Sequence, residues 1–411
     1  MKRVTRLLVL VLPLVLVASN SYAAVKPGSV CKKVGQISTV SGKKFTCIKK
    51  GKSLVWDKGV VVKAAPAPVR TPTPTTSASA PASTPIVPTG FGDLWEKRSG
   101  IAYAVWSSGS KAMAKSAVTL PPVDIFRGPN TPVYLTDKNL ITALENVAGL
   151  YAGAPMPVRI QVFVYSRADL QWGIDKAKAE MGVEYENAFQ AHGGPMIKCN
   201  IPDDCGDGDA FVGGNKVAYL ALGLSSKPDK NTLARYLAAT TETCEFYHSL
   251  QDYFYQVNNS RQKNVGGLNP SNKPPHWLNI GGENMTSALV QFKDDYEGFR
   301  KQMSENPGWV NSLGINFTSA WIDEYLSINN LNNMWSNNRF GAPSNNAAMM
   351  GQYLSQILVA AKDPSVLLEF HKLMSAGVSF EKAFLDTYGL TWASASPTIS
   401  KVILDMYQNG Y

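Results

Sequence analysis

The spacing of apolar residues after residue 90 predicts a mixture of strands and helices, followed by helices alone. Up to about residue 230, short segments with strand-like composition are separated by segments in which apolar residues recur at helical spacing. The segment 158–164 alternates most cleanly, which is typical of a strand with one buried face. Asp137 is a typical helix cap. Strands are expected over 131–135, 158–164 and 217–222, and helices over 137–150 and 169–181.

From residue 231 onward, helical spacing dominates. Asp363 followed by Pro364 is a typical helix start, because Asp can cap the first turn and Pro lacks only a donor that this turn leaves unused. The pattern therefore predicts an α+β domain over 91–411, with a mixed α/β part in 91–230 and a helical part in 231–411. Helices are expected over 231–256, 280–292, 317–330, 346–361, 364–374, 379–387 and 397–408.

The start of the chain has the pattern of a secretory signal. Basic residues at positions 2, 3 and 6 precede an apolar run of twelve residues, 7–18, and small residues follow at 21–23. This order predicts a signal peptide over 1–23, and such a run is too short to cross a bilayer. Because no later segment is long and apolar enough for a membrane helix, we expect a secreted, extracellular protein without a membrane span.

Residues 25–63 form a small basic module with two cysteines, Cys31 and Cys47. Its ten lysines and single acid, Asp57, give a net charge of +9, equal to that of the whole chain. Short strands are expected over 34–40 and 44–48. A core this small needs a covalent link and export permits one, so a Cys31–Cys47 disulfide is expected. The module resembles short cysteine-paired modules of exported actinobacterial proteins.

The charge of the basic module points to an anionic partner. A compact lysine-rich unit attracts polyanions, so an anionic polymer of the cell surface or cell wall is the expected partner, and specific nucleic-acid binding is not expected. The plainer alternative is that the lysines only keep the module soluble. Residues 64–90 follow, with seven prolines among Ala, Ser and Thr and Arg70 as the only charge, which predicts an extended linker.

The segment Cys244-Glu245-Phe246-Tyr247-His248 carries the most specific chemical pattern of the chain. On a helix, residues four apart lie on one face, so Cys244 and His248 could meet one metal ion. Cysteine and histidine both bind zinc, and a glutamate beside zinc can act as a general base.

Together with downstream residues, this segment resembles the gluzincin type of zinc metallopeptidase, a peptidase MA-like group. In that family, H-E-x-x-H is followed by W-L-x-E-G, whose glutamate is the third zinc ligand. Here Trp277-Leu278-Asn279-Ile280-Gly281 occupies the place of W-L-x-E-G, and 370–384 is similar to the helical tail of the family. The resemblance covers 130–408 and implies a zincin-like (thermolysin-like) fold, in which a mixed sheet precedes a mainly helical lobe.

Carried over by position, the resemblance makes His248 a zinc ligand and Glu245 the general base. Cys244 replaces the first histidine and Ile280 replaces the glutamate ligand. Isoleucine cannot bind zinc, and two protein ligands are fewer than the three of a typical catalytic site. We therefore expect a domain that has lost zinc-dependent catalysis, holds no zinc and binds a peptide or protein in the old cleft.

An active zinc metallopeptidase with an unusual ligand set is the alternative. Glu283 lies one helical turn after Ile280, so its carboxylate could join Cys244 and His248, with Glu245 as the base. The plain interpretation places Glu283 on the surface. His276 is a further possible ligand or a loop residue, and His276 and Trp277 are expected to line the cleft.

The remaining cysteines and acids suggest further possibilities. Cys199 and Cys205 bracket a short loop and are expected to pair, which leaves Cys244 alone. Aspartates 203, 204, 207 and 209 could hold calcium, but their spacing does not fit an EF-hand loop, so a polar surface loop is expected.

Three other roles compete for the region around Cys244. A Cys244–His248 thiolate–imidazole pair would also need an oxyanion site, which no motif marks. Glu242 and Glu245 could act as paired carboxylates in glycoside hydrolysis, which requires them to face a shared cleft. A wall-associated spacer would have no cleft ligand at all. His371 is expected to face solvent or a backbone carbonyl.

Overall fold

The chain folds as two units, Met1–Ala82 and Ser83–Tyr411. The structure, a computed structural model, describes residues 26–31, 33–40, 43–61, 84–115, 118–192, 199, 204–206, 208–257, 274–304, 317–328 and 343–410. The predicted signal peptide, most of the linker and the side chain of His276 lie outside these residues. No helix among the described residues is long and apolar enough to span a bilayer.

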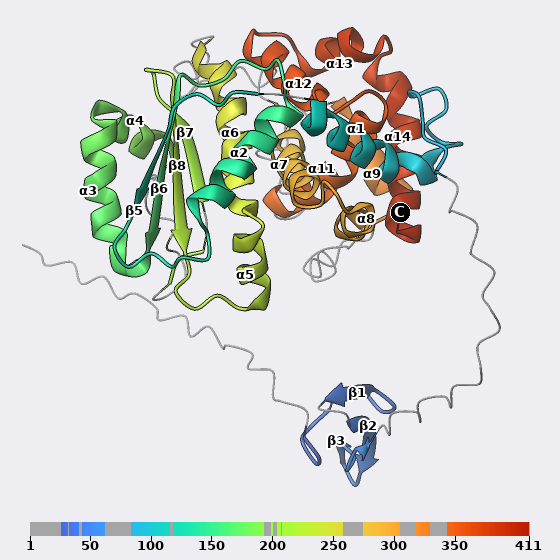
Figure 1. Ribbon diagram of the computed structural model, residues 1–411. Coiled ribbons are helices and arrows are strands. Elements are labelled where there is room, and N and C mark those ends of the chain that lie inside the picture. The colour runs from blue at the N-terminus through green and yellow to red at the C-terminus, as the bar shows by residue number, and fades with distance from the viewer. Residues whose placement is uncertain are drawn as a thin grey trace, which may run out of the picture. The chain divides into compact units, whose positions relative to one another are not determined.

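The smaller unit contains a sheet built around one central strand (Figure 1). The second strand pairs antiparallel with the other three. A disulfide joins Cys31 to Cys47, as predicted, and both cysteines are buried with Phe45 and Trp56 in a small core. The strands are β1 (Ile37–Val40), β2 (Lys43–Lys50), β3 (Ser53–Trp56) and β4 (Val60–Val61).

The larger unit has a four-stranded mixed sheet in the order β5-β6-β8-β7. The first three strands are parallel and β7 runs antiparallel to β8. With the many helices around it, this sheet confirms the predicted α+β class (Figure 1). The strands are β5 (Val123–Arg127), β6 (Arg159–Ser166), β7 (Gly208–Val212) and β8 (Val217–Leu224).

Both faces of β6 are buried, so the prediction of one buried face was wrong. Ile160 and Val162 belong to the main core, whereas Phe163 and Tyr165 belong to a second core on the other face. A central parallel strand is covered on both sides because its crossover helices pack on the two faces. These helices include α2 (Asp137–Leu150), α3 (Leu170–Met181) and α4 (Val183–His192).

The segment 131–135 is a turn, although its composition predicted a strand. The carboxylate of Asp169 accepts hydrogen bonds from the N–H of Asn130 and the hydroxyl of Thr131, and the N–H of Thr131 donates to the carbonyl of Gly128. Pro132 has no N–H for a strand ladder. The helix that follows is capped by Thr136, which accepts the N–H of Asn139, and not by Asp137.

The region expected to form one helix over 231–256 forms two, because the backbone turns at Ala239, which has φ 51°.

Residues 84–90, assigned to the linker by composition, belong to the larger unit, where Thr89 donates two hydrogen bonds to Asp93. The remaining helices are η1 (Arg98–Gly100), η2 (Arg167–Asp169), α1 (Ile101–Lys115), α5 (Lys230–Leu237), α6 (Thr240–Val257), α7 (His276–Gln291), α8 (Tyr296–Ser304), α9 (Ser319–Leu326), α11 (Pro343–Ala360), α12 (Val366–Ser375), α13 (Phe380–Tyr388) and α14 (Trp392–Asn409).

Helix α7 is held close to its neighbours by glycines. A Cβ on Gly281 would collide with the backbone of Gly351 on α11, and a Cβ on Gly282 would collide with the hydroxyl of Tyr247 on α6. Trp277, expected to line the cleft, is instead fully buried in the core, where it packs against Phe380. The close approach of α6 and α7 brings their polar side chains together.

Candidate functional site

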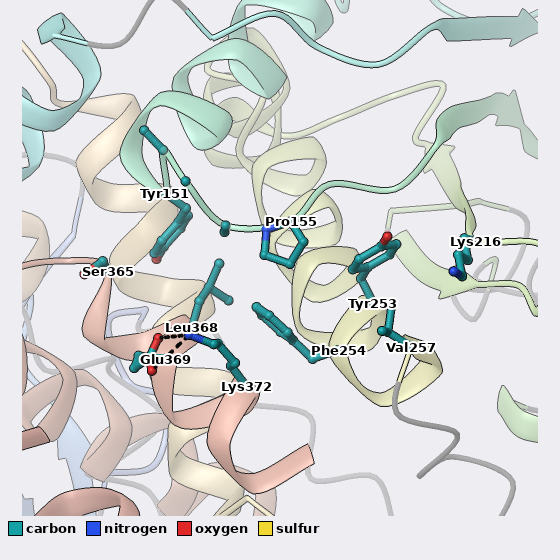
Figure 2. A pocket seen from close by; sticks show the side chains of 13 residues that line it. Tyr151, Pro155, Lys216, Tyr253, Phe254, Val257, Ser365, Leu368, Glu369 and Lys372 are labelled. Carbon is teal, nitrogen blue, oxygen red and sulfur yellow. Dashed lines mark hydrogen bonds and ion pairs between the residues drawn. The ribbon is translucent and has the colours of Figure 1, made fainter. Parts of the chain in front are cut away.

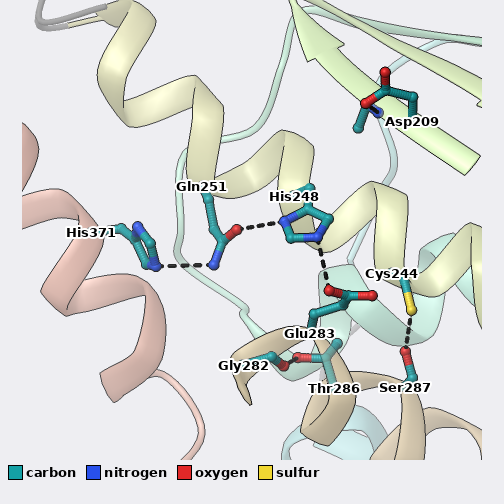
Figure 3. A network of polar contacts seen from close by, with 10 residues as sticks. Asp209, Cys244, His248, Gln251, Gly282, Glu283, Thr286, Ser287 and His371 are labelled. Atoms are coloured by element: carbon teal, nitrogen blue, oxygen red, sulfur yellow. Dashed lines mark hydrogen bonds and ion pairs between the residues drawn. The ribbon is translucent and has the colours of Figure 1, made fainter. Parts of the chain in front are cut away.

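Helix α6 lies against the sheet and carries Cys244, Glu245 and His248 toward different neighbours. Cys244 and His248 face α7, as their spacing of four predicts (Figure 3). Glu245 faces the start of β7, where a Cβ on Gly208 would lie 2.6 Å from the Oε1 atom of Glu245. The sequence signature is therefore divided between a helix–helix contact and a helix–strand contact.

The imidazole of His248 is paired with Glu283. The Nε2 atom of His248 lies 3.0 Å from Oε2 of Glu283, and their side chains are 29% and 21% exposed. Glu283 is therefore part of the site, and the interpretation that placed it on the surface was wrong. Ile280, one turn earlier on α7, is half-buried and offers no ligand atom.

Charge stabilises this pair. Burial alone would lower the pKa of His248, but the hydrogen bond and negative charge of Glu283, together with the charge of Glu245, raise it well above its ordinary value. Burial alone would raise the pKa of Glu283, but His248 lowers it. The pair is thus an imidazolium and a carboxylate, and its Nε2 proton donates to Glu283.

Cys244 is a buried thiol, 6% exposed. Its Sγ lies 2.9 Å from Oγ of Ser287, one turn after Glu283 on α7. Burial and the nearby charge of Glu283 raise the pKa of Cys244 well above its ordinary value. A protonated thiol is a poor nucleophile, so this environment does not support a thiolate–imidazole pair.

A chain of polar side chains continues from His248 to α12. Nδ1 of His248 lies 2.8 Å from Oε1 of Gln251, and Nε2 of Gln251 lies 2.9 Å from Nε2 of His371. Because the Gln251 amide donates to Nε2 of His371, the proton of His371 is on Nδ1, which lies 3.4 Å from the hydroxyl of Tyr255. Burial and the positive charge of His248 lower the pKa of His371 to about 3, so it is neutral.

His371 was expected to face solvent or a carbonyl, and this was wrong: it is 1% exposed and bonded to side chains. No role in the site was predicted for Gln251 or Ser287. A signal for both exists, because Gln251 lies three residues after His248 and Ser287 four after Glu283, so each shares a helix face with a candidate residue.

Glu242 does not share a cleft with Glu245. Its carboxylate is fully buried, and neither oxygen has a hydrogen-bond partner among the described residues. Burial raises the pKa of Glu242 to about 7. A carboxyl that solvent does not reach cannot contact a saccharide, so this arrangement gives no support to paired-carboxylate glycoside hydrolysis.

Zinc does not fit the side chains as they are arranged. The metal-binding nitrogen of His248 is engaged by Glu283, the Cys244 thiol is protonated, and Ile280 stands at the third ligand position. Among the described residues, no group of three or more His, Cys, Asp or Glu side chains has the geometry of a metal site.

The loop with the candidate calcium ligands is closed by the predicted disulfide between Cys199 and Cys205. Asp204 accepts hydrogen bonds from the N–H groups of Cys205 and Ser226 and from the hydroxyl of Ser225. Aspartates 203 and 207 lie outside the described residues. The described contacts of Asp204 give it a structural role, in tying this loop to the end of β8.

A pocket of about 560 Å³ lies near the C-terminal end of α6 (Figure 2). Its walls come from the C-terminal end of α6, from the start of α12 and from the loop after α2, and include Phe254, Leu368 and Pro155. The Gln251–His371 contact joins the same two helices, α6 and α12. None of the sequence-predicted site residues lines this pocket.

No protein-family model, curated protein or solved structure matches this chain. The side chains that α6, α7 and α12 bring together are therefore the basis for assigning a function.

Proposed function

We propose that residues 91–411 form a gluzincin-like domain that has lost zinc-dependent catalysis and binds a peptide or protein segment in the old cleft. The protein would be secreted and act at the cell surface. Two disulfides and the absence of a membrane-spanning helix among the described residues are consistent with an extracellular location.

The observation that carries the proposal is the contact of 3.0 Å between His248 and Glu283. A gluzincin needs that nitrogen for the metal, whereas here it donates a proton to a carboxylate. The thiol of Cys244 is likewise engaged, in a hydrogen bond with the hydroxyl of Ser287. The layout around the pair agrees with a gluzincin origin, since α6 follows a mixed sheet and lies against its antiparallel strand β7.

The same contact explains how the site could bind rather than cleave. His248 and Glu283 are both partly exposed, so a ligand can reach a positive and a negative group that lie side by side. Peptides offer carbonyl oxygens and N–H groups that match such a pair. The polar chain through Gln251 and His371 fixes the orientation of the imidazole, which reduces the conformational entropy lost on binding.

A second candidate is a zinc hydrolase with the ligands Cys244, His248 and Glu283. One observation favours it: the Glu283 carboxylate lies 3.0 Å from Nε2 of His248 and next to the side chain of Cys244 (Figure 3). Loss of the Nε2 and Sγ protons would be required before these atoms could bind a metal.

Elemental analysis of the exported protein separates the two candidates. After incubation with zinc and removal of loosely bound metal, we expect no zinc in the parent or in Cys244→Ser. One zinc per chain in the parent and none in the variant would establish the second candidate. Peptide hydrolysis by the parent that Glu245→Gln abolishes would lead to the same conclusion.

Binding is tested with an array of unmodified peptides and the same protein. His248→Ala should lower the affinity for the captured peptides at least about tenfold, because it removes the positive group of the cleft. Lys138→Ala, an exposed residue on α2, is the control for a lost positive charge. Equal binding by the parent and His248→Ala would refute a role for this cleft.

A further inference from the structure

The smaller unit carries an uncompensated positive charge on its surface. Asp57 is the only acidic residue among residues 1–82. Its carboxylate is half-buried and accepts the N–H groups of Thr46 and Gly59, so it acts inside the fold. Every lysine described in this unit is exposed, namely Lys26, Lys33, Lys43, Lys44, Lys49, Lys50, Lys52 and Lys58.

Six of these lysines lie in two groups, here called cluster A and cluster B, at opposite ends of β2. Cluster A contains Lys43 and Lys44 at the start of β2, and Lys58, which precedes the strand β4 that pairs with them. Cluster B contains Lys49 and Lys50 at the end of β2, and Lys52 in the turn to β3. Equivalent lysines on β2 are six residues apart, which corresponds to about 20 Å along a strand.

The separation of the clusters defines the kind of partner. A small anion could neutralise only one cluster, whereas a chain of repeated anionic groups longer than about 20 Å could contact both. The disulfide at Cys47 fixes β2 between them, so the spacing is built into the fold. Lysines act as point charges and do not form the bidentate contacts of arginine, so recognition would depend on charge spacing more than on the identity of the anion.

A lipid surface fits this unit less well. Segments that lie in a membrane interface present aromatic or bulky apolar residues beside their basic ones. The two aromatic residues described in this unit, Phe45 and Trp56, are both buried in its core. The exposed apolar residues are single β-branched side chains, among them Val30 and Val60.

We infer that the smaller unit binds an extended anionic polymer along β2, with clusters A and B in contact with the same chain. This surface belongs to the smaller unit and includes none of the residues around His248. Because all six lysines are exposed, the contact should weaken strongly as ionic strength rises and shortens the screening distance to a few ångströms.

The test uses the protein from Ala24 onward and four probes. Long-chain inorganic polyphosphate and poly-L-glutamate separate phosphate from carboxylate polymers, and triphosphate is too short to reach both clusters. Vesicles of phosphatidylcholine and phosphatidylglycerol at 7:3 provide the lipid surface. Affinities are measured by titration calorimetry at 50 mM and 500 mM NaCl.

Two triple variants and one matched control distinguish cluster spacing from net charge. K43Q/K44Q/K58Q removes cluster A and K49Q/K50Q/K52Q removes cluster B. Replacement of three exposed lysines of the larger unit, K111Q/K115Q/K138Q, changes the net charge equally. We expect each cluster variant to weaken binding of at least one long polymer by about tenfold or more, and the control to change it less than about twofold.

Triphosphate should bind at least about tenfold more weakly than the long polymer that binds best, counted per polymer chain. Four results would overturn the inference: equal losses in the control and the cluster variants, equal affinity for triphosphate and long polymer, binding to vesicles without binding to either polymer, or no binding to any probe at 50 mM NaCl.

Discussion

Replacement of Glu242 by Gln should make the larger unit more stable at high pH relative to the parent. Burial raises the pKa of Glu242 from 4.5 to about 7, because the ionised carboxylate loses its hydration and neither oxygen has a hydrogen-bond partner among the described residues. The folded protein therefore holds this proton more tightly than the unfolded chain does. The stability that the protonated group supports is lost as pH rises from about 4.5 through 7.

The magnitude follows from the two pKa values. The difference between about 7 and 4.5, at about 1.4 kcal/mol for each pH unit, corresponds to about 3 kcal/mol. Gln has nearly the same size as Glu and does not ionise, so the free-energy cost of burying its amide does not change with pH. The free energy of unfolding of Glu242→Gln, relative to the parent, should therefore rise by about 3 kcal/mol between pH 4.5 and pH 8.

Urea unfolding followed by tryptophan fluorescence at several pH values measures this difference. Glu145→Gln, which replaces an exposed carboxyl on the neighbouring helix α2, is the control. A stability difference between Glu242→Gln and the parent that does not change with pH would refute the reasoning. It would mean that in solution the carboxylate of Glu242 is hydrated, or is paired with a positive group such as Arg127.

Three further predictions concern packing, a buried carboxylate and the disulfide of the smaller unit. Gly281→Ala should destabilise the larger unit by at least about 2 kcal/mol in urea, since its Cβ would collide with α11, whereas Gly90→Ala, in open space, should not. Asp169→Ala should cost about 3 kcal/mol at neutral pH, because the carboxylate accepts hydrogen bonds from Asn130, Thr131 and Ser166. Burial would raise the pKa of Asp169 but these hydrogen bonds lower it, so the cost should shrink as pH falls from 3.8; an unchanged cost would contradict this account. Cys31→Ser should lower the stability of the smaller unit by about 3 kcal/mol, seen as faster trypsin cleavage at its lysines, and equal cleavage rates would show that the disulfide is dispensable.

The sequence by itself determined the elements whose signals are local. The helix over 137–150 and the strands near 158–164 and 217–222 were placed within two residues, because apolar spacing and turn residues act over a few positions. Both disulfides were also predicted, since in each pair the two cysteines lie close together along the sequence. The four-residue spacing placed Cys244 and His248 on one helix face.

Helix α1 shows where local signals were insufficient. The sequence Ser107-Ser108-Gly109-Ser110 at its centre has low helix propensity, and no helix was expected there. Its helix is supported by packing, since Gly109 approaches the side chain of Leu289 so closely that a Cβ would lie 2.8 Å away. Propensity along the chain cannot reveal such a contact, because the partner lies far away in the sequence.

Tertiary structure alone decided the chemistry of the candidate site. His248 meets Glu283 from 35 residues away, Gln251 meets His371 from 120 residues away, and Cys244 meets Ser287 from 43 residues away. Local patterns could list which side chains were available, but protonation depends on burial and on the charge that folding brings within hydrogen-bond distance. The sequence supplied the thiol and the imidazole, and the packing of α6 against α7 and α12 made one a buried neutral thiol and the other a paired cation.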